Sequence, residues 1–235
     1  MNINRIDIIV PVYNENEIIS FTLDELYAKI KTDFIINIIY DFDEYTTIPV
    51  VREYIRRNNL KNIFLIKNNY GKGVVNALRK GFDISKDLAT LVVMGDLSDD
   101  ISIVDRMFKK ILDGYDLVCG SRYMKGGKQT GGPVFKKFLT RMAGLSLNFF
   151  TKIPTCDISN SFKMYRTSMV KKFNLESTGG FEIGLEILVK AFLNGYKITE
   201  LPSVWRERTF GKSNFKLIQW LPKYLKWYFM AFTKK

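Results

Sequence analysis

The sequence predicts an α/β fold, with a mostly parallel β-sheet that carries helices on both faces. Two observations support this fold class. Short apolar runs alternate with longer amphipathic stretches through the first half of the chain, which is typical of parallel strands joined by helices. The 235 residues are 46% hydrophobic and 26% charged, a composition that suits one large domain with a buried core.

The elements follow one another in a regular order. We expect strands at the apolar runs, which are residues 6–12, 35–40, 63–67, 88–94, 115–120 and 197–204. We expect helices at the amphipathic stretches, which are residues 14–31, 49–59, 73–84, 101–112, 134–150 and 181–194. Pro49 favours a helix start. The stretch 125–133 is rich in glycine and lysine, which predicts a mobile loop that orders over bound substrate.

Charge and composition narrow the chemistry that the chain can carry out. With 36 Lys and Arg against 24 Asp and Glu, the net charge is +12, which favours anionic partners such as phosphorylated ligands or an acidic membrane surface. We expect no nucleic-acid partner, because only charge supports one and no recognition motif is present. The absence of histidine excludes a histidine general base and the usual zinc sites. Metal chemistry must therefore use oxygen ligands, which suit Mg²⁺ or Mn²⁺.

Ligands of open α/β sheets bind beyond the carboxyl ends of the strands, so the residues after each strand form the candidate site. After the first strand, Tyr13 and Glu15 can frame a flat base, although a plain turn with Asn14 as a helix cap explains this segment equally well. After the second strand, Asp41 and Asp43 stand in an acidic run, which is costly unless donors or a cation meet it. Because parallel neighbours share one sheet edge, we predict that Glu15 and Asp41 lie close together.

The later strand ends carry groups suited to phosphate and metal. Gly71 and Lys72 precede a helix, where a glycine turn lets a phosphate approach and the lysine can pair with it. After the fourth strand, an acidic cluster contains Asp96, Ser98 and Asp99. A divalent cation whose coordination is completed by a diphosphate would explain this cluster, whereas helix capping would explain only one of the acids.

The order of these motifs resembles that of a known family. Arg122, at the end of the fifth strand, can neutralise charge on a leaving phosphate. The whole set resembles the family 2 glycosyltransferases of the GT-A fold, a Rossmann-like nucleotide-binding fold, and among them the dolichol- and polyprenyl-phosphate sugar synthases. The resemblance rests on ordered motifs: Val10-Pro11-Val12-Tyr13-Asn14-Glu15, Gly71-Lys72-Gly73, Asp96-Leu97-Ser98, Gly120-Ser121-Arg122, residues 157–162, Glu200-Leu201-Pro202 and Arg208-Thr209-Phe210-Gly211-Lys212-Ser213.

The resemblance implies an inverting hexosyltransferase that uses a nucleoside diphosphate sugar and Mg²⁺ or Mn²⁺. It assigns Pro11, Tyr13 and Glu15 to the base, Asp41 to the nucleoside, and Arg122 and Arg208 to phosphates. We expect the substrate site to include also Asn14, Asp43, Gly71, Lys72 and Lys212. Asp96 matches the second acid of the family's Asp-x-Asp metal motif. Met94 replaces the first acid, so we expect Ser98 and Asp99 to complete the metal site. We expect Asp96, Arg122 and Asp157 to be catalytic.

The acceptor stays open between two chemistries. A polyprenyl phosphate would carry an anionic oxygen and would need no general base, and its phosphate would be bound by the basic residues Lys136, Lys137, Arg141 and Arg208. A sugar hydroxyl, as in the synthesis of a surface polysaccharide, needs a base, for which Asp157 or Glu182 could serve. An inactive nucleotide-binding relative is a third hypothesis, supported by Met94 alone.

The resemblance implies a glycosyltransferase domain at residues 1–215, and we expect residues 216–235 to form a distinct segment. This segment mixes Trp, Tyr, Phe and Leu with lysines, which predicts docking on an anionic membrane surface. We expect Pro222 to interrupt any single long helix there. The alternative is packing on the domain or on a partner subunit, which leaves a homo-oligomer open. No basic leader and no run of about 20 apolar residues is present, so we expect a cytoplasmic protein, peripheral on the inner face of the membrane.

Overall fold

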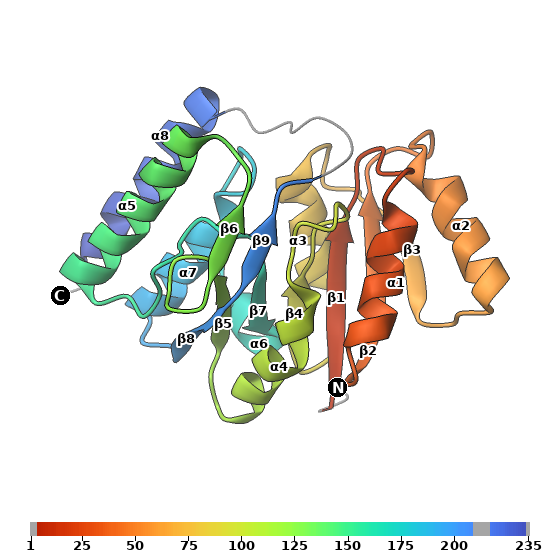
Figure 1. The fold of residues 1–235 in the computed structure, drawn as a ribbon, viewed down its shortest axis with the longest axis horizontal. Coiled ribbons are helices and arrows are strands. Elements are labelled where there is room, and N and C mark those ends of the chain that lie inside the picture. Colours follow the sequence, from red (N-terminus) through yellow and green to blue (C-terminus); the bar gives the residue numbers. More distant parts are fainter. Residues whose placement is uncertain (1–3, 209–216, 234–235) are drawn as a thin grey trace.

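Seven strands pair into one sheet in the order β3-β2-β1-β4-β7-β5-β8 in the computed structural model, which describes residues 4–208 and 217–233 (Figure 1). The strands are β1 (Arg5–Pro11), β2 (Asp33–Tyr40), β3 (Ile63–Lys67), β4 (Ala89–Val92), β5 (Leu117–Ser121), β7 (Lys163–Arg166) and β8 (Ile198–Pro202). β7 runs antiparallel to its neighbours β4 and β5, and the other pairs in this sheet are parallel. The prediction of a mostly parallel α/β sheet is therefore confirmed.

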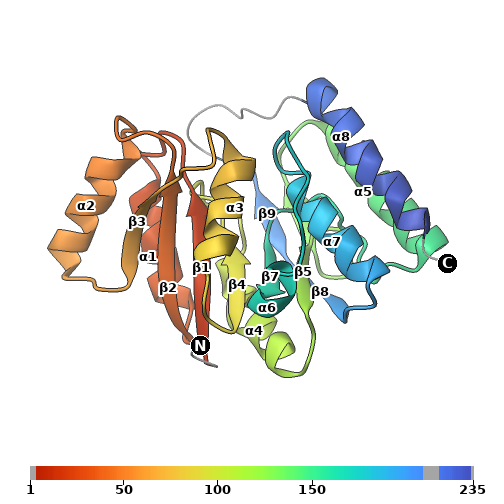
Figure 2. The ribbon, with the colours of Figure 1, turned by 180° about the vertical axis from the view of Figure 1, so that it is seen from behind.

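Helices cover both faces of the sheet (Figure 1, Figure 2). One face carries α1 (Ile19–Lys29), α2 (Thr47–Asn58) and α4 (Val104–Leu112), which follows the 3₁₀ turn η1 (Ile101–Ile103), and the other carries α3 (Val74–Ile84), α6 (Thr167–Val170) and α7 (Ile183–Leu193). β1 serves both apolar cores, because Ile8 faces the first and Ile9 the second. α3 approaches β1 so closely at Gly81 that an added Cβ would lie 2.5 Å from Ile9 Cγ2. A larger residue at position 81 would therefore force the Ile9 side chain to shift.

Three short strands lie outside the set expected from the sequence. They are β7 and the parallel pair formed by β6 (Lys128–Thr130) and β9 (Val204–Arg206). Hydropathy does not reveal β7, because Lys163 and Arg166 interrupt its apolar pattern even though Lys163 is fully buried. β6 occupies part of the stretch 125–133, where the sequence predicted a loop and no strand. Its backbone is held by pairing with β9, and the mobility of the stretch stays a prediction.

The first helix begins at Ile19 rather than near residue 14. Asn14 has a left-handed backbone with a φ of 54°, and its Oδ1 accepts a hydrogen bond from Thr46 N at 3.0 Å. Glu15 N donates to Thr47 Oγ1 at 2.7 Å. The chain after β1 is thus a turn tied to the start of α2. This turn places Glu15 at the carboxyl edge of the sheet.

At one end of the molecule, α5 (Val134–Thr151) and α8 (Leu217–Met230), with the 3₁₀ turn η2 (Ala231–Thr233) after it, lie side by side (Figure 1, Figure 2). Trp227 of α8 is 1% exposed, and the ammonium groups of Lys190 and Lys226 lie 5.1 and 4.5 Å from its ring centre. Tyr228 Oη and Ser146 Oγ of α5 share a hydrogen bond of 2.8 Å. α8 therefore packs on the domain, and the expected boundary at residue 216 falls outside the described residues.

Pro222 lies inside α8, so the expected interruption of a long helix there is wrong. A proline within a helix removes one hydrogen bond and costs about 3 kcal/mol. Packing outweighs this cost, because Trp227 is buried and Trp220 meets the ring of Phe181 edge-on, with the ring centres 6.0 Å apart. In the described ranges, no helix combines the length and the apolar character needed to cross a bilayer.

Candidate active site

Two carboxylates and one guanidinium meet at the carboxyl edge of the sheet. Glu15 follows β1, Asp96 follows the adjacent strand β4, and Arg208 follows β9. Arg208 Nη2 donates to Asp96 Oδ2 at 2.6 Å, and Arg208 Nη1 lies 3.7 Å from Glu15 Oε1. Burial raises the pKa of Glu15, Arg208 acts against that rise, and Asp96 adds to it. Lys212, expected beside Arg208, lies outside the described residues.

The loop after β4 holds the Asp96 carboxylate in place through a backbone hydrogen bond. Asp96 Oδ1 accepts a hydrogen bond from Ser98 N at 3.1 Å, across a turn in which Leu97 has a left-handed φ of 58°. Asp99 Oδ2 accepts a hydrogen bond from Met94 N at 2.8 Å, and burial raises the pKa of Asp99 to about 7. Asp99 therefore holds the loop backbone in this conformation, while Asp96 Oδ2 is bonded to Arg208.

These residues supply few protein ligands for a divalent cation. Among the described residues, no group of three His, Cys, Asp or Glu side chains could hold a metal ion without further ligands. Proteins nevertheless bind Mg²⁺ through one or two carboxylates, with water and substrate phosphates as the other ligands. Asp96 can supply one such carboxylate. Glu15 lies near enough for the charge of Asp96 to raise its pKa, so it can supply the second. Asp96 and Glu15 thus fit a cation whose remaining ligands would come from water or from a bound phosphate.

The ends of β2 and β3 form the expected nucleoside region. Asp41 accepts hydrogen bonds from Asn68 Nδ2 at 2.9 Å and from Gly73 N at 2.7 Å. Asp41 thereby ties these two strand ends to the glycine turn that precedes α3. Tyr13 is 56% exposed and meets the ring of Tyr45 edge-on at 5.2 Å, so its ring is available for stacking on a base.

The remaining residues assigned to the nucleotide lie around this region. Pro11 ends β1, and Gly71 has a left-handed φ of 96°. Lys72 is exposed in the same turn. Asp43 pairs with Lys67 on the surface. Contact of any of these residues with a nucleoside stays a prediction.

Arg122 and Asp157, both expected to be catalytic, bind each other in a buried pair. Arg122 Nε donates to Asp157 Oδ2 at 2.7 Å and Arg122 Nη2 to Asp157 Oδ1 at 2.8 Å. Asp157 also accepts hydrogen bonds from the backbone nitrogens of Arg122 and Asn160. Burial raises the pKa of Asp157, but the Arg122 guanidinium outweighs burial, and the net pKa lies below its usual value. Asp157 is therefore a weak base whose oxygens are all occupied.

Glu182, the other candidate base, is also engaged by backbone groups. It is fully buried and accepts hydrogen bonds from Gly179 N at 2.6 Å and Gly180 N at 2.5 Å. Trp220 of α8 packs directly over Gly180, where an added Cβ would lie 2.6 Å from the indole ring. Glu182 therefore stabilises the turn before α7, and α8 packs on that turn through Trp220.

A basic cavity of about 460 Å³ lies between the chain after β5 and the helix α5. It is lined by Arg122, Tyr123, Met124, Lys125, Gly127, Lys128, Gln129, Lys137 and Arg141. Of these residues, five are cationic and none is acidic. Lys137 and Arg141 were expected at an acceptor phosphate, and the structure brings them together with Arg122. Gln129 had no recognisable signal in the sequence, because the pairing of β6 with β9 brings it here, whereas Tyr123 directly follows Arg122 in the chain.

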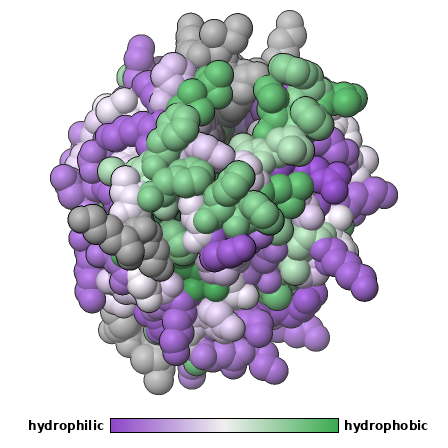
Figure 3. Space-filling model, turned by 90° about the vertical axis from the view of Figure 1, so that its left-hand side faces the viewer, coloured by the Kyte–Doolittle hydropathy of each residue, from purple (hydrophilic) through white to green (hydrophobic). Residues whose placement is uncertain are grey.

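Apolar side chains gather on the outer surface of α5 and α8, next to this cavity (Figure 3). Val134 is 82% exposed and Phe135 is 68% exposed. The face continues with Phe138, Leu139, Met142, Phe149, Phe150, Leu221, Leu225, Phe229 and Phe232. Exposed apolar patches of this extent mark surfaces that bind another molecule or a membrane. The sequence signal was the helical apolar spacing of residues 134–150, which normally marks a buried face.

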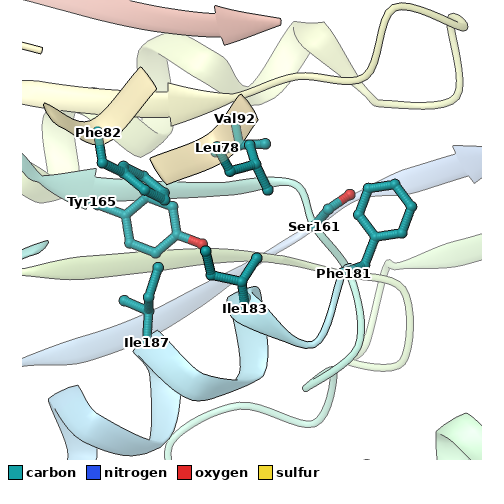
Figure 4. A pocket seen from close by; sticks show the side chains of 9 residues that line it. Leu78, Phe82, Val92, Ser161, Tyr165, Phe181, Ile183 and Ile187 are labelled. Atoms are coloured by element: carbon teal, nitrogen blue, oxygen red, sulfur yellow. The ribbon is translucent and has the colours of Figure 1, made fainter. Parts of the chain in front are cut away.

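A second, much smaller cavity of about 10 Å³ lies within the core beside α7 (Figure 4). Leu78, Phe82, Val92, Tyr165, Ile183 and Ile187 are among the residues that line it. The ring of Tyr165 meets that of Phe82 edge-on, with centres 5.3 Å apart. A space of this size holds at most one water molecule, so it is a packing defect rather than a substrate site.

Comparison with known proteins identifies the family of this chain. The family model described as Glycosyl transferase family 2 matches residues 7–173. The dolichol-phosphate mannosyltransferase of Pyrococcus furiosus is 27% identical over 221 residues, which cover 90% of this chain and 59% of that protein. The polyprenol monophosphomannose synthase of Mycolicibacterium smegmatis is 22% identical over 228 residues, which cover 91% of this chain and 85% of that protein. The chain thus spans about three fifths of the Pyrococcus protein.

Solved structures share the fold. Glucosyl-3-phosphoglycerate synthase from Mycobacterium tuberculosis, crystallised with Mn²⁺, uridine diphosphate and glucosyl-3-phosphoglycerate, has a TM-score of 0.66 at 13% identity. The match covers 97% of this chain and 80% of that chain. The ordered strand-end motifs, the GT-A sheet and the family match agree, and the chain belongs to glycosyl transferase family 2.

Proposed function

We propose that this chain is an inverting hexosyltransferase that moves a sugar from a nucleoside diphosphate sugar to a polyprenyl phosphate. The observation that carries the proposal is the basic cavity beside the exposed apolar face of α5. An acceptor with a phosphate head and a long hydrocarbon chain needs both features together. The names of the Pyrococcus and Mycolicibacterium relatives support this acceptor class.

The donor would lie at the carboxyl edge of the sheet. Its base would stack on Tyr13, and its diphosphate would meet Lys72 and Asp96 through a Mg²⁺ or Mn²⁺ ion. Ser98 and Asp99 would support Asp96 in that role, chiefly by fixing the loop. Such an ion stabilises the negative charge that develops on the departing diphosphate. The solved relative that contains Mn²⁺ and uridine diphosphate supports a divalent cation here.

The acceptor phosphate would bind to Lys137 and Arg141, with Arg122 at the inner wall of the cavity. Its oxygen is already anionic near neutral pH, so direct displacement needs no general base. This requirement agrees with the state of Asp157, whose pKa is lowered and whose oxygens are occupied. A carbohydrate hydroxyl would need a base, whereas Asp157 is bound by Arg122 and Glu182 is fully buried with both oxygens bonded to backbone nitrogens.

We place the protein at the cytoplasmic face of a membrane, as a peripheral protein. The outer face of α5 and α8 would enter the headgroup boundary, and lysines around it would meet anionic lipid. Liposome flotation tests this placement. A double variant with Phe135→Ser and Phe138→Ser should float less well than wild type, whereas Phe64→Ser, an exposed phenylalanine on β3, should float like wild type. Equal flotation of all three proteins would remove membrane docking from the proposal.

A transfer assay tests the function. A thermal-shift screen of UDP- and GDP-hexoses with and without Mn²⁺ first identifies the donor, because a bound ligand raises the Tm. Lys137→Ala and Arg141→Ala should then raise KM for a polyprenyl phosphate by about tenfold or more, as expected for loss of a charged hydrogen bond, with KM for the donor unchanged. Lys109→Ala, an exposed lysine on α4, is the matched control.

Three outcomes would contradict this function. Transfer to a sugar hydroxyl but not to polyprenyl phosphate would favour the polysaccharide alternative. Retention at the anomeric carbon, seen by NMR of the product, would refute inversion. Binding of a donor without transfer or hydrolysis in Mn²⁺ would favour an inactive relative.

A further inference from the structure

We propose that Arg208 is an internal cation that occupies the metal position on Asp96 until the donor arrives, so that metal loading depends on the donor. This inference rests on the proposed metal site at Asp96. It adds an order of events to that site: the guanidinium leaves Asp96 for the donor diphosphate as the divalent cation takes its place.

The geometry leaves room for one cation at a time. Asp96 Oδ1 is taken by the backbone nitrogen of Ser98 at 3.1 Å, so Oδ2 is the oxygen that a ligand can use. Arg208 Nη2 already donates to Oδ2 at 2.6 Å. A divalent cation such as Mg²⁺ binds carboxylate oxygen at about 2.0–2.1 Å. Both partners use the same oxygen atom, and two positive charges at that separation repel, so the guanidinium and the divalent cation compete for it.

The charge of the site explains why a resident cation is needed. Glu15 Oε1 lies 3.7 Å from Arg208 Nη1, so one guanidinium serves two carboxylates. Both carboxylates are largely buried, with side-chain exposures of 16% for Glu15 and 9% for Asp96. Without a cation they would repel each other in a poorly solvated position. Arg208 meets this need in the absence of ligand, and its own side chain is 22% exposed.

β9 is bonded to the loop after β4, so the exchange needs no movement of the backbone. Arg206 N donates to Ser98 O at 3.0 Å, and Val204 N donates to Asp100 Oδ2 at 3.1 Å. These bonds fix β9 to the same loop that carries Asp96. Arg208 follows two residues after β9, so its guanidinium starts beside Asp96 and needs only side-chain rotation to reach a phosphate placed there.

The donor diphosphate would supply a new partner for the guanidinium and further ligands for the metal. A diphosphate brings negative charge that can accept the guanidinium as a bidentate partner. The same diphosphate adds oxygen ligands for the metal, which a site with one or two carboxylates requires. Metal and donor should therefore strengthen each other's binding, and this coupling is reciprocal.

Titration of the full chain with Mn²⁺ alone tests the proposal. Free Mn²⁺ is followed by its EPR signal, without nucleotide, so that no activity enters the readout. Arg208→Gln should bind Mn²⁺ at least tenfold more tightly than wild type, because the competing cation is gone. Arg208→Lys keeps a cation and should stay near wild type. Arg106→Gln, on the exposed side of α4, removes the same charge far from the site and should leave Mn²⁺ affinity unchanged.

A further variant separates failure of this inference from failure of the site. Asp96→Asn should lose Mn²⁺ binding, both alone and combined with Arg208→Gln. If Asp96→Asn removes the binding but Arg208→Gln leaves it equal or weaker, the exchange is overturned and the metal site stands. If Asp96→Asn leaves Mn²⁺ affinity unchanged, the metal is not at Asp96, and both the site and the exchange are wrong.

Discussion

The pair of Arg122 and Asp157 allows a sharp test of whether Asp157 is a base or a structural anchor. Asp157→Asn keeps the size of the side chain but removes its charge. It leaves the guanidinium of Arg122, whose side chain is 10% exposed, without its anionic partner. Loss of one partner from a buried ion pair typically costs about 3–5 kcal/mol. We therefore expect a large loss of stability from a change of a few atoms.

The size of this chain converts that loss into a change of Tm. Unfolding entropy of about 2.1 cal/mol/K per residue corresponds to about 0.5 kcal/mol/K for the 235 residues. The cost of breaking the pair then lowers Tm by about 6–10 °C. Differential scanning calorimetry measures this shift directly. Glu53→Gln is a matched control, because Glu53 and Arg56 form the same forked pair on the exposed surface of α2, where screening leaves little to lose.

Activity of the same variant, measured below its Tm, completes the test. A general base contributes about 10²- to 10⁴-fold to a rate, so loss of a base would lower kcat by that factor while Tm hardly moved. A structural anchor gives the opposite result: a lower Tm with kcat largely kept. The double variant Arg122→Met with Asp157→Leu should recover part of the lost stability, because it removes both buried charges. An unchanged Tm together with lost transfer would refute the structural reasoning and restore Asp157 as a base.

Four further predictions follow from particular contacts. Because the pKa of Asp157 is lowered in the folded protein, its contribution is present above the ordinary aspartate pKa of about 3.9, and the Tm gap between wild type and Asp157→Asn should shrink as pH falls below that value. Gly144→Ala should destabilise although alanine favours helices, because its Cβ would overlap a backbone carbonyl packed against α5; a raised Tm would show that this helix can shift. Trp227→Ala should cost about 3–5 kcal/mol by opening a cavity under α8, whereas Phe229→Ala, on the exposed side, should change Tm little in the same calorimeter. Asp96→Asn should abolish transfer with an unchanged circular dichroism spectrum, and wild-type rates would remove Asp96 from the site.

Much of the sheet could be predicted because its signal is local. The apolar runs that became β1, β4 and β5 are buried on both faces, and those of β2, β3 and β8 are apolar although partly exposed, so hydropathy marks all six. β7 was not predicted because it contains Lys163, which is buried. The ammonium group of Lys163 donates to backbone carbonyl groups that only the fold brings near. Its pKa is lowered by burial, which is the physical sign of that unusual position.

The sequence by itself determined the fold class and the strand-end groups, because strand period and strand-end position are properties of short segments. Only the tertiary structure decided how those groups are used. Arg122 meets Asp157 across 35 residues, and Arg208 meets Asp96 across 112 residues. It also decided that the apolar stripe of α5 lies at the surface beside a basic cavity rather than in the core. Charge pairing and burial depend on which distant segments share a space, and that follows from the packing of the whole sheet.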